Sequence, residues 1–216
     1  MSARWSERTA WPRSPICGNV EDFLVDGACV IGLCANEGAG GTSPSLALLQ
    51  KIKENTSIQV YVMVRPREAD FTYSAVEIEL ILREIELFKQ VGADGIVCAA
   101  LTSDAQIDVP VVKQMVAAAS PLPFTFHRAF DHVKNPLFAL EQLIDCSCAC
   151  ILTSGQEPSV FEGQVLVKQL IEKANGRIGI LPGAGVNSQN VKEIVDFTGC
   201  NEIHLSAKKM MQRQVA

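Results

Sequence analysis

The sequence lacks both the long apolar run of a membrane-spanning chain and the basic cluster of a nucleic-acid-binding one. Its longest apolar run, from Val30 to Ala35, is far below the roughly 18 residues that a membrane helix requires. The 19 Lys and Arg and the 24 Asp and Glu are interspersed and leave a net charge of −5, so no basic surface is predicted for phosphate backbones or acidic membranes. We therefore expect neither nucleic acid nor membrane as a partner, and a small molecule or an ion instead.

The sequence also lacks an export signal, and this decides how its eight cysteines are interpreted. No charged segment followed by an apolar one resembles a signal peptide, so we expect reduced thiols inside a cell rather than a disulfide framework. No compact Cys-x-x-Cys metal loop is present. The run Cys146, Cys148 and Cys150 would face one side of an extended segment. Because the run enters a strand rather than leaving one, packing is favoured over a metal site there.

No linker or low-complexity segment divides the chain. The 216 residues are 48% hydrophobic, which is enough for one substantial core, and we expect a single domain over residues 16–216. Residues 1–15 are rich in Arg and Ser, and Glu7 is their only acid. We expect a disordered N-terminal tail there, with an organelle transit peptide as the alternative.

Short β-branched apolar segments alternate with longer amphipathic ones, which predicts a parallel sheet with helical crossovers. A doubly wound sheet is the rival, but eight strands suit closure into a TIM-type (β/α)8 barrel, the predicted fold class. The first helix, near residues 20–24, and the C-terminal helix are short or missing, so the barrel is predicted to be incomplete there. The expected strands are residues 29–34, 59–64, 95–99, 123–126, 149–153, 178–182 and 202–205, with a weak first strand near 16–17. The expected helices are residues 45–55, 74–91, 109–119, 136–146, 163–175 and 189–197.

Helix 74–91 carries the clearest end signals. Ser74 and Glu77 fit a capping box at its start. Gly92 tolerates the left-handed conformation that ends a helix, so the chain is expected to turn there into the next strand.

Polar side chains follow directly after several expected strands. Arg65 and Arg67 follow one, and His127, Arg128 and Asp131 follow another. Functional groups of parallel barrels gather at the carboxyl ends of the strands, so these side chains are expected to share one opening.

The two arginines are candidates for binding an anion. Arg65 and Arg67 point the same way by the period of two along a strand, and two guanidinium groups in one opening would attract an anion. The alternative is ion pairing with loop carboxylates such as Asp70 or Asp131.

His127 is the candidate general acid or base, with Arg65 and Asp131 completing the catalytic candidates. The alternative is a core histidine that is hydrogen-bonded to a neighbour. Asp131 would orient or charge-pair His127, or else cap the helix that follows.

Two glycines and a serine follow the last two expected strands, where many barrels bind phosphate through backbone N–H groups. A tight turn without a ligand explains the same glycines, and the absence of a third glycine favours that alternative slightly. The anion-binding candidates are therefore Arg65, Arg67, Gly183, Gly185 and Ser206.

Several motifs occur together in the order and spacing of one known family. They are GGTSPS at 40–45, VMVRPR at 62–67, DFTYS at 70–74, GADG at 92–95, FHRAFD at 126–131, LTSG at 152–155, PGAG at 182–185, and His204 with Ser206. On these motifs, which span nearly everything after residue 16, the chain resembles the CutC copper-homeostasis family. The resemblance implies a TIM barrel, self-association as a dimer or tetramer, a location in the cytoplasm and also the nucleus, and a role in copper binding or trafficking.

The same resemblance implies a metal site. The thiols suggested to bind Cu(I) in the family correspond to Cys17 and Cys34 here, and soft sulfur ligands suit Cu(I). The alternative for Cys34 is a small buried apolar residue at a strand end. The chain departs from the family pattern at Gly32, where a glutamate is usual, and at Leu205, where a cysteine commonly follows the last strand's histidine.

Three functions remain open from the sequence. The leading hypothesis is a copper-homeostasis protein that binds Cu(I) through Cys17 and Cys34 without a committed reaction. The alternative is a TIM-barrel enzyme that acts on a small anionic metabolite, phosphorylated or carboxylate. A non-catalytic scaffold is the third.

Overall fold

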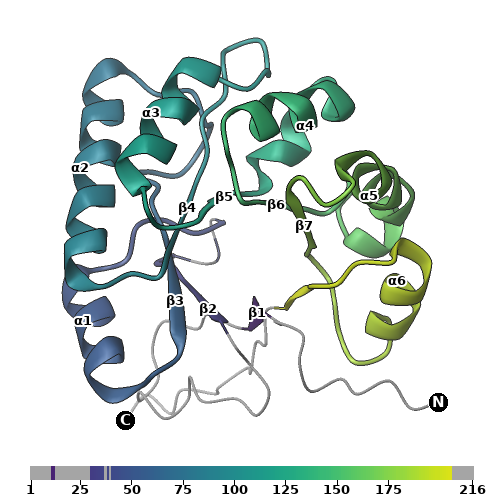
Figure 1. Ribbon diagram of the computed structural model, residues 1–216, viewed down its shortest axis with the longest axis horizontal. Coiled ribbons are helices and arrows are strands. Elements are labelled where there is room, and N and C mark those ends of the chain that lie inside the picture. Colours follow the sequence, from purple (N-terminus) through teal and green to yellow (C-terminus); the bar gives the residue numbers. More distant parts are fainter. Residues whose placement is uncertain (1–10, 13–29, 37, 39, 206–216) are drawn as a thin grey trace, which may run out of the picture.

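The computed structural model describes residues 11–12, 30–36, 38 and 40–205. Strands and helices alternate along these residues (Figure 1). The strands are β1 (Trp11–Pro12), β2 (Val30–Leu33), β3 (Gln59–Met63), β4 (Gly95–Cys98), β5 (Phe124–Phe126), β6 (Cys150–Thr153), β7 (Gly179–Pro182) and β8 (His204–Leu205). The helices are α1 (Leu46–Asn55), α2 (Ala75–Val91), α3 (Val109–Ala119), α4 (Pro136–Asp145), α5 (Val160–Ala174) and α6 (Val191–Thr198), with a 3-10 helix at Arg128–His132.

Strands β2 to β7 form one parallel sheet of six strands, each paired with the next along the sequence. Figure 1 shows this sheet curled, with α1 to α6 in an arc along its outer side. A doubly wound sheet reverses its strand order at a switch point. No reversal occurs from β2 to β7, so the rival fold is wrong and the chain has an α/β fold with a curled parallel sheet.

The first and last strands of the described residues form a separate sheet. β1 pairs in parallel with β8, with Trp11 opposite His204 and Pro12 opposite Leu205. β1 also lies close to β2, but no ladder joins β1 to β2 or β7 to β8 in the described part of the chain. Those residues therefore form two sheets rather than one closed ring of eight strands.

The N-terminal region differs from the prediction. β1 lies at Trp11–Pro12, inside the segment 1–15 that was predicted to be a disordered tail. The expected strand near residues 16–17 and the expected helix near 20–24 lie outside the described residues. A strand of 2 residues has no alternating pattern, so nothing in the sequence distinguishes it from a tail.

The helix ends show which local signals the sequence carries. Ser74 and Glu77 form the predicted capping box of α2, and Gly92 ends that helix with φ 101°. Helix α5 begins earlier than predicted because Ser159 and Glu162 form a second capping box, which the same Ser-x-x-Glu pattern announces.

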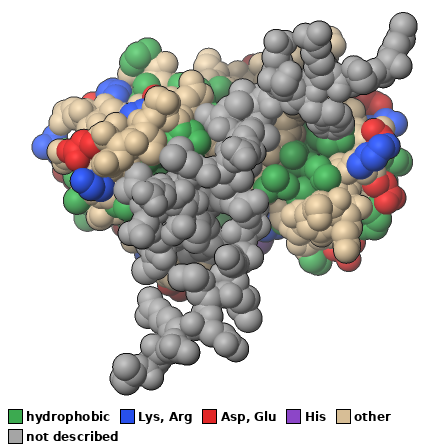
Figure 2. All heavy atoms as spheres, turned by 90° about the horizontal axis from the view of Figure 1, so that it is seen from below, with side chains coloured by type: hydrophobic (Ala, Val, Ile, Leu, Met, Phe, Trp, Pro, Cys, Tyr) green, Lys and Arg blue, Asp and Glu red, His purple; other side chains and the backbone are tan. Residues whose placement is uncertain are grey.

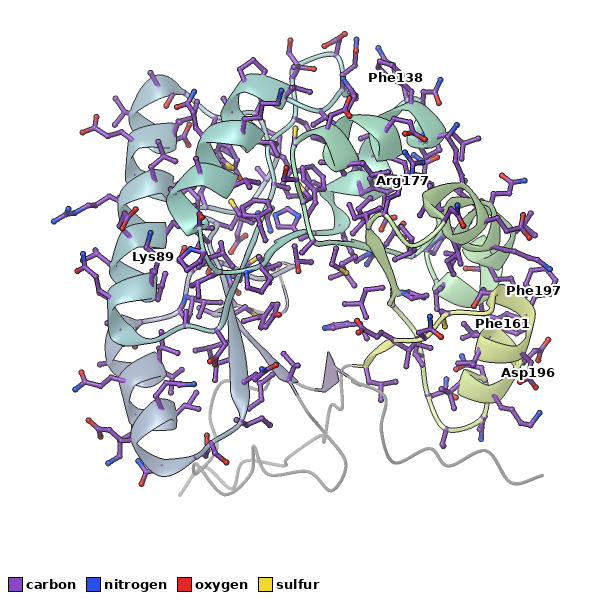
Figure 3. The ribbon with its side chains drawn as sticks, in the orientation of Figure 1. Lys89, Phe138, Phe161, Arg177, Asp196 and Phe197 are labelled. Atoms are coloured by element: carbon purple, nitrogen blue, oxygen red, sulfur yellow. The ribbon has the colours of Figure 1, made fainter. Side chains whose placement is uncertain are left out.

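Side chains along each strand alternate between two apolar layers, as the period of two requires. On β3, Val62 is fully buried in the main core between sheet and helices, whereas Tyr61 and Met63 pack with the inner cluster. That cluster has Val30, Val97 and Leu181 at its centre. Figure 3 shows strand side chains pointing inward from the curled sheet. The inner layer forms the floor of the site described below.

Polar contacts also tie neighbouring helices together. Arg177 donates two hydrogen bonds to Glu141 of α4, at 2.7 and 2.9 Å. Lys89 of α2 donates to the carbonyl oxygens of Ala118 and Ser120 at the end of α3, at 2.6 and 3.2 Å; Arg177 and Lys89 are labelled in Figure 3. Exposed ion pairs contribute less than about 1 kcal/mol each, so the apolar core remains the main source of stability.

Two glycines allow α5 to start directly against the end of β6. A Cβ on Gly163 would lie 2.0 Å from the carbonyl oxygen of Ser154, and one on Gly155 would lie 2.2 Å from the carbonyl oxygen of Gly163. Gly155 also has φ +75°, a conformation that disfavours other residues. The loop after β6 therefore keeps its position only with glycine at both sites.

We predict that Gly163→Ala destabilises the fold. Alanine ordinarily gains about 1 kcal/mol over glycine within a helix, but overpacking against backbone costs about 1–3 kcal/mol or more, and here the obstructing atom is a carbonyl oxygen that cannot rotate away. The expected net loss is about 2 kcal/mol by urea denaturation. Glu172→Ala, at an exposed position of the same helix, is the control and should change stability by less than about 0.5 kcal/mol. A Gly163→Ala variant as stable as wild type would contradict the contact.

Candidate functional site

A cavity of about 830 Å³ lies at the carboxyl ends of the strands, and we call it the mouth cavity. Its apolar wall includes Leu33, Met63, Phe71, Val97, Leu152 and Leu181. Its polar lining includes Cys34, Arg65, Thr125, His127, Arg128 and His204. The structure thus brings Cys34, Arg65 and His127 to one opening, although the sequence separates them widely.

Arg65 is 4% exposed and holds two loops together. Its Nη1 donates to the carbonyl oxygen of Gly41 at 3.1 Å, and its Nη2 donates to that of Ala69 at 2.9 Å. The guanidinium carbon lies 4.8 Å from the centre of the Phe71 ring, within range of a cation–π interaction. Arg65 therefore joins the loop after β2 to the loop after β3 while its charge stays at the cavity wall.

His127 is 4% exposed and its hydrogen bond identifies its tautomer. The backbone N–H of Ala129 donates to His127 Nδ1 at 3.1 Å, so in the neutral ring the proton is carried by Nε2. Burial, followed by the positive charge of Arg65, lowers the pKa of His127 to about 3. His127 is therefore a neutral imidazole with an N–H donor at Nε2.

Two polar atoms at and directly after β5, on the cavity lining, have no hydrogen-bond partner within the described part of the chain. They are Nε2 of His127 and Oγ1 of Thr125, both buried. Thr125 precedes His127 by two positions and starts the same inner row of β5. Thr125 is not among the site residues predicted from the sequence, although the period of two counted back from His127 points to it.

The hydrogen bonds of the Asp131 carboxylate hold the loop after β6 in place and are not directed at His127. Its carboxylate accepts from the hydroxyl of Thr153 at 2.5 Å, the backbone N–H of Ser154 at 3.0 Å and Arg128 Nε at 2.7 Å. No hydrogen bond joins Asp131 to His127 in the described residues, so Asp131 does not orient the His127 ring in the predicted way. The side chain of Asp131 is only 6% exposed.

Arg67 does not line the mouth cavity, although the period of two from Arg65 predicted that it would. The strand ends at Met63, so the alternation no longer applies at Arg67. Its side chain instead pairs with Glu77 at 2.5 Å and Asp70 at 3.0 Å, which is the ion-pairing alternative. Hydrogen bonds from Ser74 and Arg67 lower the pKa of Glu77 to about 2.

Cys34 is half-buried directly after β2, on the wall of the mouth cavity. A Cβ on Gly41 would lie 3.4 Å from both Cys34 Sγ and Met63 Cε, so the two sulfur-bearing side chains flank Gly41. Cys17 lies outside the described residues. Within those residues no group of three or more His, Cys, Asp or Glu side chains forms a metal site.

The expected phosphate loop is explained largely by packing. A Cβ on Gly183 would lie 2.9 Å from Leu152 Cδ1 and 3.0 Å from His204 Cβ, so this glycine is needed between strands. Gly185 lines the cavity, and its carbonyl oxygen accepts from Asn190 at 2.9 Å. Ser206 lies outside the described residues.

The Cys-x-Cys-x-Cys run lies away from the mouth cavity. Cys146 and Cys148 are buried in the core, and Cys150 begins β6. Cys150 lines a second cavity of about 400 Å³ with Cys200 and Glu202. Burial raises the pKa of Cys150 to about 12, so this thiol stays protonated at neutral pH, as expected for a packing role.

Figure 2 shows Lys and Arg side chains beside Asp and Glu at both edges of one face, outside the grey residues. Among the described helices, none combines the length and apolar composition that a membrane crossing needs.

Comparisons with known proteins agree with the motif pattern. The profile of the CutC family matches residues 17–209. A family protein CutC from Pasteurella multocida is 47% identical over 182 residues, covering 84% of this chain and 75% of that protein. The Homo sapiens copper homeostasis protein cutC homolog is 46% identical over 182 residues, covering 84% of this chain and 67% of that protein.

Solved structures agree with the fold. A CutC structure from Streptococcus agalactiae superposes with a TM-score of 0.85 at 28% identity, covering 91% of this chain and 97% of that one. A dihydrodipicolinate synthase from Bacillus anthracis reaches 0.61 at 14% identity, covering 92% and 70%. The second likeness concerns the fold alone, and it places the curled sheet among TIM-barrel proteins.

We predict that the His127 imidazole stays neutral from pH 7 down to pH 5. Its folded-state pKa of about 3 lies below the unfolded value of about 6.5, so the unfolded chain binds the proton first. Stability is therefore fully present above pH 6.5 and declines as the pH falls from there towards 3. Long-range ¹H–¹⁵N spectra, assigned with His127→Gln, measure both pKa and tautomer. A His127 midpoint near pH 6 would contradict the buried neutral ring.

We also predict that Asp131→Ala destabilises the protein by about 3 kcal/mol, because removing one partner of a buried charged network leaves several donors unsatisfied. Asp145→Ala, at an exposed helix end, is the matched control and should stay within about 0.5 kcal/mol of wild type. Thermal and urea unfolding provide the measurement. Equal stability of the two variants would mean that Asp131 does not hold the loop after β6.

Proposed function

The chain belongs to the CutC family, and from this premise we propose that it serves copper homeostasis by binding Cu(I) through thiolate sulfur at the mouth cavity. Curated relatives carry the name copper homeostasis protein. The observation that supports the proposal is the position of Cys34 on the cavity wall, beside Met63.

The ligand chemistry fits a soft monovalent ion. Cu(I) prefers thiolate and thioether sulfur, and it accepts low coordination numbers. Cys34 offers a thiol and Met63 a thioether, on neighbouring strands β2 and β3. Cys17, the second thiol implied by the family, would complete the set. Copper is cargo in this proposal rather than a cofactor for a reaction.

The proposal also covers the closure of the barrel, the self-association of the chain and its location in the cell. We infer that β1, which pairs with β8 and lies close to β2, closes an eight-stranded (β/α)8 barrel. Exposed apolar side chains at Phe161 and Val165 on α5 and at Phe197 on α6 offer a surface for a dimer or tetramer; Figure 3 labels both phenylalanines. The cytoplasm, and also the nucleus, are the proposed compartments.

The metabolite-enzyme alternative receives less support. A general base works best with a pKa near the working pH, and the pKa of His127 is lowered to about 3. Arg65 is engaged with two loop carbonyls, and Asp131 with the loop after β6. We therefore assign no acid–base reaction to these three residues.

Anaerobic Cu(I) titration against a chromogenic competitor tests the copper proposal. Wild type is expected to bind one Cu(I) per chain. Cys34→Ser should weaken binding by more than about 100-fold, because loss of a group that only hydrogen-bonds a metal ligand already costs up to about that much. Met63→Leu keeps the side-chain volume and should weaken binding less. Cys146→Ala, far from the mouth cavity, is the control. Unchanged affinity in Cys34→Ser would remove the proposed site.

A further inference from the structure

The inner row of β5 carries two buried polar groups whose hydrogen-bonding capacity is unused within the described residues. Thr125 is 1% exposed and His127 4% exposed, and neither Oγ1 nor Nε2 has a partner there. Proteins rarely leave buried polar atoms unpaired, because burial removes them from water without a replacement bond. Thr125 lies in β5, and His127 directly follows the strand with a backbone that is still extended, so the two side chains face the same side and both line the mouth cavity.

The hydrogen-bonding direction of this pair defines what it binds. Nδ1 of His127 accepts from the Ala129 N–H, so Nε2 carries the proton and can only donate. The Thr125 hydroxyl rotates freely and donates where an acceptor is offered. A ligand that satisfies both groups must therefore present acceptor oxygen atoms.

Charge and shape narrow the class of ligand. The charge of Arg65 reaches the His127 ring, where it is one of the causes of the lowered pKa, so an anion is favoured over a cation. The carboxylates nearby already serve other groups, since Asp70 pairs with Arg67 and Asp131 with Arg128. Val97 lies opposite Thr125 on the neighbouring strand, and Leu152 and Leu181 line the same cavity. These walls suit a short carbon skeleton.

Phosphate fits the pocket less well than carboxylate. Phosphate sites of barrels depend on clustered backbone N–H groups after the last strands. In the described residues Gly183 is enclosed by Leu152 and His204, and its N–H donates to Thr153 O at 2.9 Å. Gly185 offers its carbonyl oxygen to Asn190 instead.

We propose that the mouth cavity binds a small organic carboxylate, such as a 2-oxo acid, whose oxygens accept hydrogen bonds from His127 Nε2–H and Thr125 Oγ1–H beside Arg65. Phe71 is the gate of this site. Its ring centre lies 5.1 Å from that of His127 and 4.8 Å from the Arg65 guanidinium carbon. Since Nε2 of His127 is shut off from water, the half-buried Phe71 ring beside it is the side chain that we expect to move when the ligand enters. The donors of the site lie on the β5 wall of the cavity, and binding there does not require copper.

Thr125→Val separates a binding role from a structural one. Valine keeps the β-branched shape of threonine and replaces the unpaired hydroxyl with a methyl group. A buried hydroxyl without a hydrogen-bond partner destabilises the ligand-free protein, so the melting temperature of the variant should be about 3 °C higher than that of wild type. It should also bind carboxylate about tenfold more weakly, since it lacks one hydrogen bond to a charged group.

The experiment titrates metal-free protein with pyruvate at pH 7 and follows the ¹H–¹⁵N signal of His127 Nε2–H. Wild type is expected to show a saturable shift, and Thr125→Val a shift that needs about tenfold more pyruvate. Ethylammonium at equal ionic strength is the control for charge, and inorganic phosphate the control for anion class. The proposal is overturned if pyruvate leaves His127 unmoved, if Thr125→Val binds equally well or melts below wild type, or if phosphate binds more tightly than pyruvate.

Discussion

The alternation of side chains across a curled parallel sheet is the constraint on which the rest of this structure depends. Along β3 it sends Val62 outward into the main core and Met63 inward to the mouth cavity. Along β5 it sends Thr125 inward, and His127 follows on the same side. Because each strand contributes one inward row, residues far apart in sequence meet at the carboxyl ends without any long connecting loop. A slip of one residue in any strand would exchange the cavity lining with the core.

Much of the fold follows from local signals that the sequence states directly. The capping box of Ser74 and Glu77 and the left-handed Gly92 set the ends of α2. The backbone N–H and C=O groups at a helix end have no partner within the helix, so they require such capping residues. The alternation of strands and helices predicted the parallel sheet, since crossovers require a helix between parallel strands. The capping box of Ser159 and Glu162 marks the start of α5, which apolar spacing alone placed three residues too late. The first strand is different, because the 2 residues of β1 are too few for any periodic pattern.

The candidate site was less predictable because its side chains lie where periodicity ends. Arg65 and Arg67 look equivalent in sequence, yet β3 stops at Met63, and only Arg65 remains at the cavity. Arg67 pairs with Glu77, whose carboxylate also closes the helix cap. Asp131 was linked to His127 by nearness along the chain, whereas its carboxylate serves Ser154 in the next βα unit. Which partner each charged side chain binds depends on the donors and acceptors that surround it in three dimensions. The spacing of residues along one segment does not contain this information.

One backbone contact separates two kinds of chemistry within the mouth cavity. The Ala129 N–H occupies Nδ1 of His127, which leaves Nε2 protonated and without a lone pair for a metal ion. A soft ion entering the cavity therefore meets sulfur on β2 and β3 and finds no competing nitrogen ligand at His127. An acceptor oxygen is instead favoured beside His127 and Thr125, because the imidazole N–H and the Thr125 hydroxyl donate well, whereas a thiol donates weakly and a thioether has no hydrogen to donate. In the two proposals the 3-10 turn that begins at Arg128 fixes the tautomer, and the tautomer separates the donors for oxygen ligands from the sulfur atoms offered to Cu(I).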